Sequence, residues 1–197
     1  MLLNIFLTAS LAALLVLADG QYKSRPDLSP PKITVTQQIP HLISDDLLFL
    51  TPRAPLNKNG QQPHEAQSGA YIFTPQGELV WSGYTYFGTP AFNFQAGKYK
   101  GENVIYAFQG GFNPDYGHGH GWVRILNDRY ELVAEVRAGR SKLCDLHEFQ
   151  ITESGTGLVE IYQPTQRDLS KWGATSAKQR WVVDDLFQGI CLFCFWC

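Results

Sequence analysis

The sequence predicts an all-β protein built as a partial β-propeller, with about two four-stranded blades and the start of a third. Aromatic residues make up 13% of the 197 residues and accompany 18 Gly and 11 Pro, a composition typical of short strands joined by tight turns. From residue 69 onward, short apolar segments alternate with turn signals. A weak internal repeat relates these segments, and together the observations favour evenly spaced hairpins over helices.

Successive hairpins account for the predicted sheet structure. They join Tyr71–Phe73 to Leu79–Trp81, Ala91–Phe94 to Val104–Phe108, Trp122–Leu126 to Leu132–Val136, and Phe149–Ile151 to Leu158–Tyr162. The sequence Glu78-Leu79-Val80 recurs as Glu131-Leu132-Val133, 53 residues later. Because two hairpins supply four strands, we expect the first two hairpins to form one blade and the last two another. A third blade is expected to begin at Arg180-Trp181.

A second architecture fits the same spacing. One blade cannot bury both of its faces, so a propeller requires blades that stack side by side. A free-standing β-sandwich of about eight strands in two sheets is also built from evenly spaced hairpins. The periodicity therefore leaves both architectures open.

The chain divides into four predicted segments. Residues 1–18 read as a secretory signal peptide, since their apolar core is shorter than the roughly 20 residues of a membrane-spanning helix. Residues 19–68 are a Pro-rich extended leader and a polar loop, residues 69–188 the partial propeller, and residues 189–197 an atypical Cys-rich tail. We therefore expect a secreted, extracellular protein with no stable membrane insertion after cleavage.

The charge distribution bears on possible partners. Sixteen basic and 18 acidic residues give a formal net charge of -2, and no long run of either sign occurs. Nucleic-acid binding sites need a concentration of positive charge. We therefore expect no nucleic-acid partner.

Several motifs together resemble the fungal arylsulfotransferase-like family. They are Gly69–Phe73, Gly77–Trp81, Gly117–Gly121, Asp145–Phe149 and Arg180–Asp184. The resemblance runs from about Arg25 to Gln188, as the N-terminal part of the family pattern, and extends distantly to bacterial periplasmic aryl-sulfate sulfotransferases. It implies a six-bladed propeller whose central histidines relay sulfate from an aryl sulfate ester to a phenol. It implies no nucleotide sulfate donor, and we expect no cofactor.

The last segment departs from the family pattern. After Gln188 the chain contains Cys191, Cys194 and Cys197 among apolar residues, where a relative would continue with further blades. We interpret this tail as foreign, with unpaired or scrambled cysteines rather than a metal or redox motif. The chain is thus expected to be truncated relative to the six-bladed family.

His147 is the leading catalytic candidate. A neutral imidazole is both a nucleophile and a leaving group near neutral pH, which suits sulfuryl transfer. Asp145 lies two residues earlier and would share a strand face with His147. Its carboxylate would then hold the imidazole in one tautomer and stabilise developing positive charge. The alternative is that His147 is an internal, hydrogen-bonded structural histidine.

His118 and His120 are the second pair of candidates. They lie in a glycine-rich run whose backbone amides suit an anion such as sulfate. Either histidine would protonate a departing phenolate or supply positive charge. The alternatives are a long solvated turn and a His-x-His metal site, but two histidines without a spaced third ligand are a weak metal signal, so we expect no metal.

Substrate-binding candidates are Arg124, Arg140 and Tyr116. A guanidinium fork matches an oxyanion such as sulfate, although most surface arginines are merely solvated. Four further aromatic residues would line an acceptor pocket or, more simply, pack the core. They are Trp81, Tyr84, Tyr86 and Phe87.

Three functions remain open at this stage. The first is a secreted arylsulfotransferase-like enzyme that transfers a sulfuryl group from an aryl sulfate to a phenolic acceptor through a histidine. The second is a non-catalytic propeller that binds an aromatic ligand, a glycan or a protein, because a fold does not fix a function. The third is a non-functional or inactive fragment.

Overall fold

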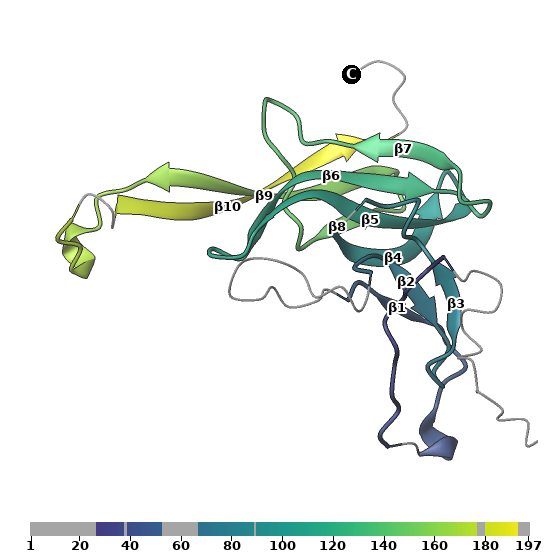
Figure 1. Cartoon of the computed structure of the whole chain (residues 1–197). Helices are drawn as coiled ribbons and strands as arrows, with labels where there is room; N and C mark the ends of the chain where they lie inside the picture. Colours follow the sequence, from purple (N-terminus) through teal and green to yellow (C-terminus); the bar gives the residue numbers. More distant parts are fainter. Residues whose placement is uncertain (1–26, 38, 53–66, 89, 177–179, 193–197) are drawn as a thin grey trace, which may run out of the picture.

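The computed structural model describes residues 27–37, 39–52, 67–88, 90–176 and 180–192, and these form three antiparallel β-sheets (Figure 1). Within these ranges the helical segments are two single 3-10 turns, η2 (Pro40–Leu42) and η3 (Ser170–Trp172). The all-β prediction is therefore confirmed. No helix in the described ranges is long and apolar enough to cross a membrane.

The first sheet has three short strands in the order β1-β2-β3. They are β1 (Leu48–Leu50), β2 (Tyr71–Phe73) and β3 (Leu79–Ser82). All three residues of β2 are buried, as expected for the central strand of a sheet that is covered by other parts of the chain. The predicted hairpin from Tyr71 to Trp81 is confirmed.

The second sheet is a four-stranded meander in the order β4-β5-β6-β7. Its strands are β4 (Ala91–Tyr99), β5 (Glu102–Asn113), β6 (His118–Leu126) and β7 (Leu132–Val136). Lys100 and Gly101 connect β4 to β5 with φ angles of 53° and 83°. Positive φ at both central residues defines the type I′ turn, whose twist matches that of the strands it joins.

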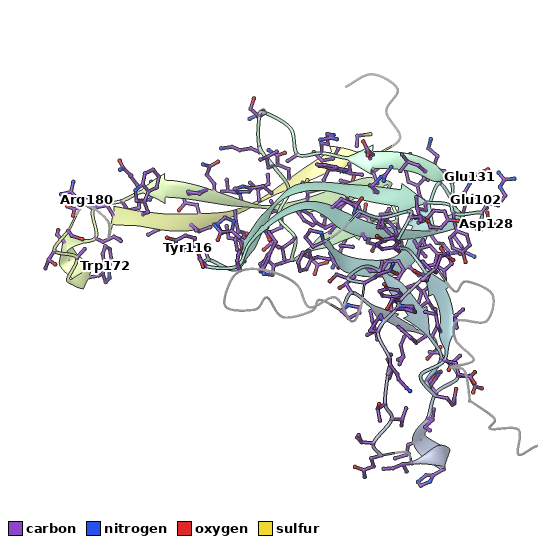
Figure 2. All side chains as sticks on the ribbon, in the orientation of Figure 1. Glu102, Tyr116, Asp128, Glu131, Trp172 and Arg180 are labelled. Atoms are coloured by element: carbon purple, nitrogen blue, oxygen red, sulfur yellow. The ribbon has the colours of Figure 1, made fainter. Side chains whose placement is uncertain are left out.

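The third sheet has the order β10-β9-β8. Its strands are β8 (Phe149–Ile151), β9 (Thr156–Gln166) and β10 (Trp181–Cys191). The β9–β10 pair extends away from the other sheets as a long two-stranded arm, with Trp172 and Arg180 at its far end (Figures 1 and 2).

The predicted grouping of hairpins into blades is wrong. The second and third hairpins share the second sheet, because β5 pairs with β6 from Ile105↔Leu126 to Asn113↔His118. The repeat itself has a structural counterpart. The two copies of the recurring sequence lie at the start of β3 and β7, and each of these strands is at the edge of its sheet. β5 and β9, which begin at Glu102 and Thr156, are each the second strand in the order of their sheets. Local patterns specify hairpins but not which hairpins pair with each other, so the repeat does not determine which four strands share a sheet.

The predicted boundary at Gln188 does not coincide with any break in the structure. β10 continues through Gly189 to Cys191 and pairs with β9 along its whole length, ending at Cys191↔Thr156. Cys191 is disulfide-bonded, so the expectation of unpaired tail cysteines is wrong for this residue. The predicted signal peptide, residues 1–18, lies outside the described residues.

Two apolar clusters cover the two faces of the second sheet. Along β5, Val104, Tyr106 and Phe108 belong to the cluster shared with the third sheet. Ala107, between them, belongs to the cluster shared with the first sheet. This alternation follows from the two-residue period of a strand. The second sheet is therefore sandwiched between its two neighbours.

The cluster between the first and second sheets contains much of the aromatic content. Phe87 is 1% exposed, and the ring of Trp81 lies 5.9 Å from that of Phe94 and 4.9 Å from that of Tyr130. Trp81 and Phe87 are thus packing residues of the core. Tyr84 and Tyr86 are exposed.

We predict that Ile125→Ala will lower the free energy of unfolding by about 2–5 kcal/mol, because truncation of a buried side chain leaves a cavity. Ile125 is 0% exposed near the C-terminal end of β6. Chemical denaturation measures the effect. Leu132→Ala is the control, because Leu132 is 47% exposed and its truncation should cost less than about 1 kcal/mol. Equal losses in both variants would contradict the described core.

Candidate functional site

The segment that carries Asp145 and His147 lies between β6 and β9. Cys144 forms an isolated antiparallel bridge with Gly121 of β6, with N···O distances of 2.9 and 3.2 Å for the two hydrogen bonds. One residue later, the Asp145 amide donates to the Glu160 carbonyl of β9 at 2.7 Å. Backbone hydrogen bonds on both sides therefore fix the position of the segment.

Glycine is required at two positions of β6, where the strand lies against the Asp145 segment and against β5. A Cβ on Gly119 would lie 2.8 Å from Leu146 Cδ2 and 2.9 Å from the Gly111 carbonyl oxygen, and one on Gly121 would lie 2.0 Å from the Gln109 carbonyl oxygen of β5. None of these distances is compatible with a side chain. The glycine-rich run thus lets two stretches of backbone come close together.

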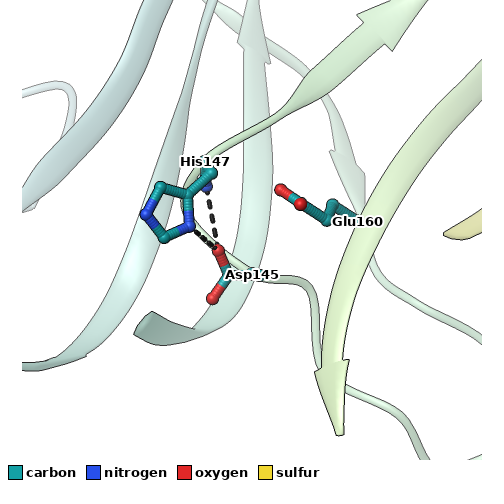
Figure 3. Close-up of side chains that lie close together, drawn as sticks. All are labelled: Asp145, His147 and Glu160. Carbon is teal, nitrogen blue, oxygen red and sulfur yellow. Dashed lines mark hydrogen bonds and ion pairs between the residues drawn. The ribbon is translucent and has the colours of Figure 1, made fainter. Parts of the chain in front are cut away.

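The Asp145 carboxylate organises the centre of the site. The side chain of Asp145 has no exposed surface, and its Oδ1 accepts a hydrogen bond from the Gly119 amide at 2.8 Å. Its Oδ2 accepts from the His147 amide at 3.0 Å and contacts His147 Nδ1 at 2.5 Å (Figure 3). When Nδ1 carries the proton, the lone pair of a neutral His147 lies on Nε2. The imidazole itself is 44% exposed, so Nε2 belongs to a ring that substrate can reach.

The predicted contact between Asp145 and His147 is present, but its predicted geometric reason is wrong. The two residues precede β8 and lie in a bend rather than on a strand. The Asp145 carboxylate accepts from the amide two residues ahead, which is the Asx-turn arrangement. The turn, and not a shared strand face, brings the carboxylate to the imidazole.

The other two candidate histidines lie near this pair, around Tyr162 of β9. The ring of His147 stacks on that of Tyr162 at a centroid distance of 5.3 Å, and the ring of His118 lies 6.4 Å from it. His118 and His120 are 5.1 Å apart. His118 is buried, and its Nδ1 has no hydrogen-bond partner. Tyr162 is therefore the residue that links the candidate histidines.

A hollow of about 210 Å³ opens beside these histidines. It is lined by Gly111, Phe112, Asn113, His118, Gly119 and His120. Tyr116 stands at the turn between β5 and β6, with its ring 6.3 Å from that of His118. It is 76% exposed, so its ring is available to a molecule that approaches the hollow.

Two carboxyl groups of the third sheet, those of Glu160 and Asp185, also lie near His147. Glu160 and Tyr162 lie two residues apart on β9, and Asp185 of β10 lies opposite Tyr162 in register. Burial raises the pKa of Glu160, and the negative charges of Asp185 and Asp145 raise it further. Burial also raises the pKa of Tyr162, and the negative charges of Glu160, Asp185 and Asp145 raise it further. The site is thus rich in negative charge on the β9–β10 side.

The predicted arginines lie apart from this cluster. Arg124 forms an ion pair with Glu135 at 3.4 Å and donates to the Tyr86 carbonyl at 3.1 Å, six residues along β6 from His118. Arg140 is exposed in the turn after β7, with a φ angle of 55°. Figure 2 shows Tyr116 at one end of the second sheet and Glu102, Asp128 and Glu131 at the other. Of the predicted binding residues, the structure places Tyr116 beside the histidines.

Sequence reasoning did not include Glu160, Tyr162 or Asp185 among the site residues. Glu160 and Tyr162 alternate with the buried Val159 and Ile161, a two-residue period that identifies them as polar groups on one face of a strand. That pattern is enough to predict that Glu160 and Tyr162 share the polar face of a strand. It could not have shown that this face meets His147, because the Asp145 segment is placed by long-range pairing.

A comparison with known protein families identifies the chain. The model of the arylsulfotransferase (ASST) family matches residues 95–193, just over half of the sequence. The chain belongs to this family. The match includes His118, His120, Asp145, His147 and Tyr162, and membership indicates an arylsulfotransferase-like function with aryl sulfate or phenol substrates. No curated protein and no solved structure matches the chain significantly.

We predict that Gly119→Ala will destabilise this arylsulfotransferase family member by about 1–3 kcal/mol, because its methyl group overlaps Leu146 and the Gly111 carbonyl. Gly111→Ala is the matched control on the paired strand, since the nearest atom to its new Cβ lies 4.0 Å away. Urea denaturation compares the two variants. A Gly111→Ala variant as unstable as Gly119→Ala would contradict the close approach described above.

We predict that Glu160→Gln will change how stability depends on pH. The folded state raises the pKa of Glu160, so it binds a proton more tightly than the unfolded chain, and stability falls as pH rises above the unfolded value. The glutamine variant lacks this loss and should gain melting temperature relative to wild type as pH is raised from about 4 to 7. Glu153→Gln, in the exposed turn between β8 and β9, is the control for the loss of one surface carboxyl group. Parallel profiles for wild type and Glu160→Gln would contradict the prediction.

Proposed function

We propose that the protein transfers a sulfuryl group from an aryl sulfate to a phenolic acceptor through His147. In the first step, His147 Nε2 attacks the sulfur atom, the bond between sulfur and the aryl oxygen breaks, and the phenolate departs with that electron pair. In the second step, the acceptor oxygen attacks the sulfur, the sulfur–nitrogen bond breaks, and the lone pair returns to Nε2. The acceptor phenol gives its proton to the histidine that protonated the departing phenolate, His118 or His120, so both steps balance.

The observation that carries the proposal is the contact between Asp145 and His147. A buried carboxylate 2.5 Å from Nδ1 holds the proton on that nitrogen and leaves Nε2 as the nucleophile. Sulfuryl transfer gives the imidazole positive charge, which the adjacent buried carboxylate stabilises. These are the two requirements of a histidine that acts as both nucleophile and leaving group.

The neighbouring residues take supporting roles in this proposal. His118 and His120 adjoin the hollow and would donate a proton to the departing phenolate or stabilise the sulfuryl oxygens. Tyr162 stacks on His147 and restricts rotation of the nucleophilic ring, while Tyr116 offers an exposed aromatic face to a phenolic ring. Arg124 is left out because its side chain is paired with Glu135.

We also propose that the three sheets are consecutive blades, or parts of blades, of a propeller. The support is the complete four-stranded meander β4–β7, which is covered on both faces by neighbouring sheets. A blade of a propeller has this arrangement. Secretion through a signal peptide at residues 1–18 remains part of the proposal, and N-terminal sequencing of protein from the culture medium tests it.

We predict that His147→Ala will lower transfer from p-nitrophenyl sulfate to phenol by at least about 100-fold, because the variant lacks the nucleophile. Release of p-nitrophenol measures the first step, and phenyl sulfate formation measures the second. His41→Ala is the matched control, since His41 is exposed in η2 and should retain full activity.

The same experiment separates the proposed enzyme from a binding module. Equal turnover in wild type and His147→Ala would remove His147 from the mechanism. Saturable binding of the phenol by wild type without any product would contradict the transferase proposal and favour a non-catalytic aromatic-binding protein.

A further inference from the structure

The Asp145–His147 pair has a third neighbour that the proposed reaction does not use. Each of Asp145, His147 and Glu160 offers one ligand atom, and these atoms all lie within 4.8 Å of one another. Figure 3 shows the Glu160 carboxylate reaching from β9 toward the other two side chains. We propose that these three residues bind a divalent metal ion such as Mn²⁺ or Zn²⁺, and that the ion switches off the nucleophile.

The donor set suits such an ion. One imidazole nitrogen and two carboxylate oxygens form a set that Zn²⁺ and related divalent ions accept, with water completing the coordination. Bonds of about 2.0–2.2 Å place neighbouring ligand atoms roughly 3 Å apart. The separation between ligand atoms, at most 4.8 Å, therefore needs to shorten by less than about 2 Å, while the 2.5 Å contact between Asp145 and His147 opens slightly to admit the ion.

The Glu160 carboxyl group interacts with Asp185, but one of its two oxygen atoms is available to an ion. Glu160 Oε2 is buried and has no hydrogen-bond partner, so turning it toward an ion breaks no hydrogen bond at that atom. A buried polar atom without a partner costs free energy. Coordination to a cation would satisfy it.

The balance of charge also favours a cation here. Asp185 lies beside Glu160, so three carboxyl groups gather around His147. In the described ranges, no lysine or arginine forms an ion pair with Asp145, Glu160 or Asp185. A divalent ion would supply the positive charge that the surrounding side chains do not.

The inhibitory consequence follows from the two ring nitrogens of histidine. The nitrogen nearest the carboxylates is Nδ1, at 2.5 Å from Asp145 Oδ2. An ion bound to Nδ1 uses its lone pair, so the neutral ring carries its proton on Nε2. Nε2 then has no lone pair with which to attack sulfur. This consequence rests on the proposed function, whereas metal binding does not.

The binding test uses Mn²⁺, because carboxylate and imidazole ligands suit this ion better than the thiolates of the chain do. The purified full chain is freed of metal with EDTA, and bound Mn²⁺ is counted by the loss of the free-ion signal in electron paramagnetic resonance. We expect one ion per wild-type chain and at least about 10-fold weaker binding by Glu160→Gln. Glu153→Gln should bind as wild type does.

Two results would overturn the site. One is no binding to wild type at about 1 mM Mn²⁺, and the other is equal binding by wild type and Glu160→Gln. Thermal melting monitored by circular dichroism shows whether Glu160→Gln remains folded. Asp185→Asn, which alters the charge without removing one of the three ligands, is a second variant and should weaken binding less than Glu160→Gln.

The consequence for His147 has its own measurement. Long-range ¹H–¹⁵N spectra of the labelled chain report which ring nitrogen carries the proton, and diamagnetic Zn²⁺ is the probe. We expect Zn²⁺ to place the proton of the His147 ring on Nε2 and EDTA to reverse the change. A ring that keeps its proton on Nδ1 with the ion bound would overturn the switch, even if turnover assays had already refuted the proposed transferase.

Discussion

The site depends on one buried charge, the carboxylate of Asp145. A carboxylate removed from water is costly unless hydrogen bonds replace its hydration. Here the amides of Gly119 and His147 and the imidazole of His147 replace it. The same three contacts therefore stabilise the charge and fix the orientation of the catalytic candidate.

That charge constrains the chain around it. Gly119 must bring its amide to Asp145 while Leu146 packs against its α-carbon, which excludes a side chain at this position. Gly121 pairs with Cys144, and the close Gln109 carbonyl of β5 excludes a side chain at this position. The glycine-rich run is thus explained as a place of close backbone approach, and its histidines are held on a regular strand rather than in a long turn.

The second sheet connects this local arrangement to the whole fold. Its two faces are both apolar, and each is covered by a neighbouring sheet. The core shared with the third sheet includes Cys144, Leu146 and Phe149, which flank the site residues. Packing of these residues therefore holds the Asp145 segment against β9, where Tyr162 and Glu160 meet His147.

Two features of the surroundings of His147 have opposite effects on its ring nitrogens. Asp145 favours a ring with its proton on Nδ1, whereas the acidic groups of the third sheet create a place that favours a cation. Both effects act on the same nitrogen. The neighbours of His147 therefore determine whether Nε2 carries a proton and is a hydrogen-bond donor, or carries a lone pair and is a nucleophile.

The sequence by itself determined the all-β class, the hairpins, the family and the leading residues Asp145 and His147. These follow from local signals: alternation along a strand, glycine-containing turns, and motifs contained within a few positions. Only the tertiary structure decided that the second and third hairpins share a sheet, that Arg124 is paired elsewhere, and that Tyr162 and Glu160 face His147. These features arise from pairing and packing between distant segments, and a two-residue period specifies a strand face without specifying what that face will meet.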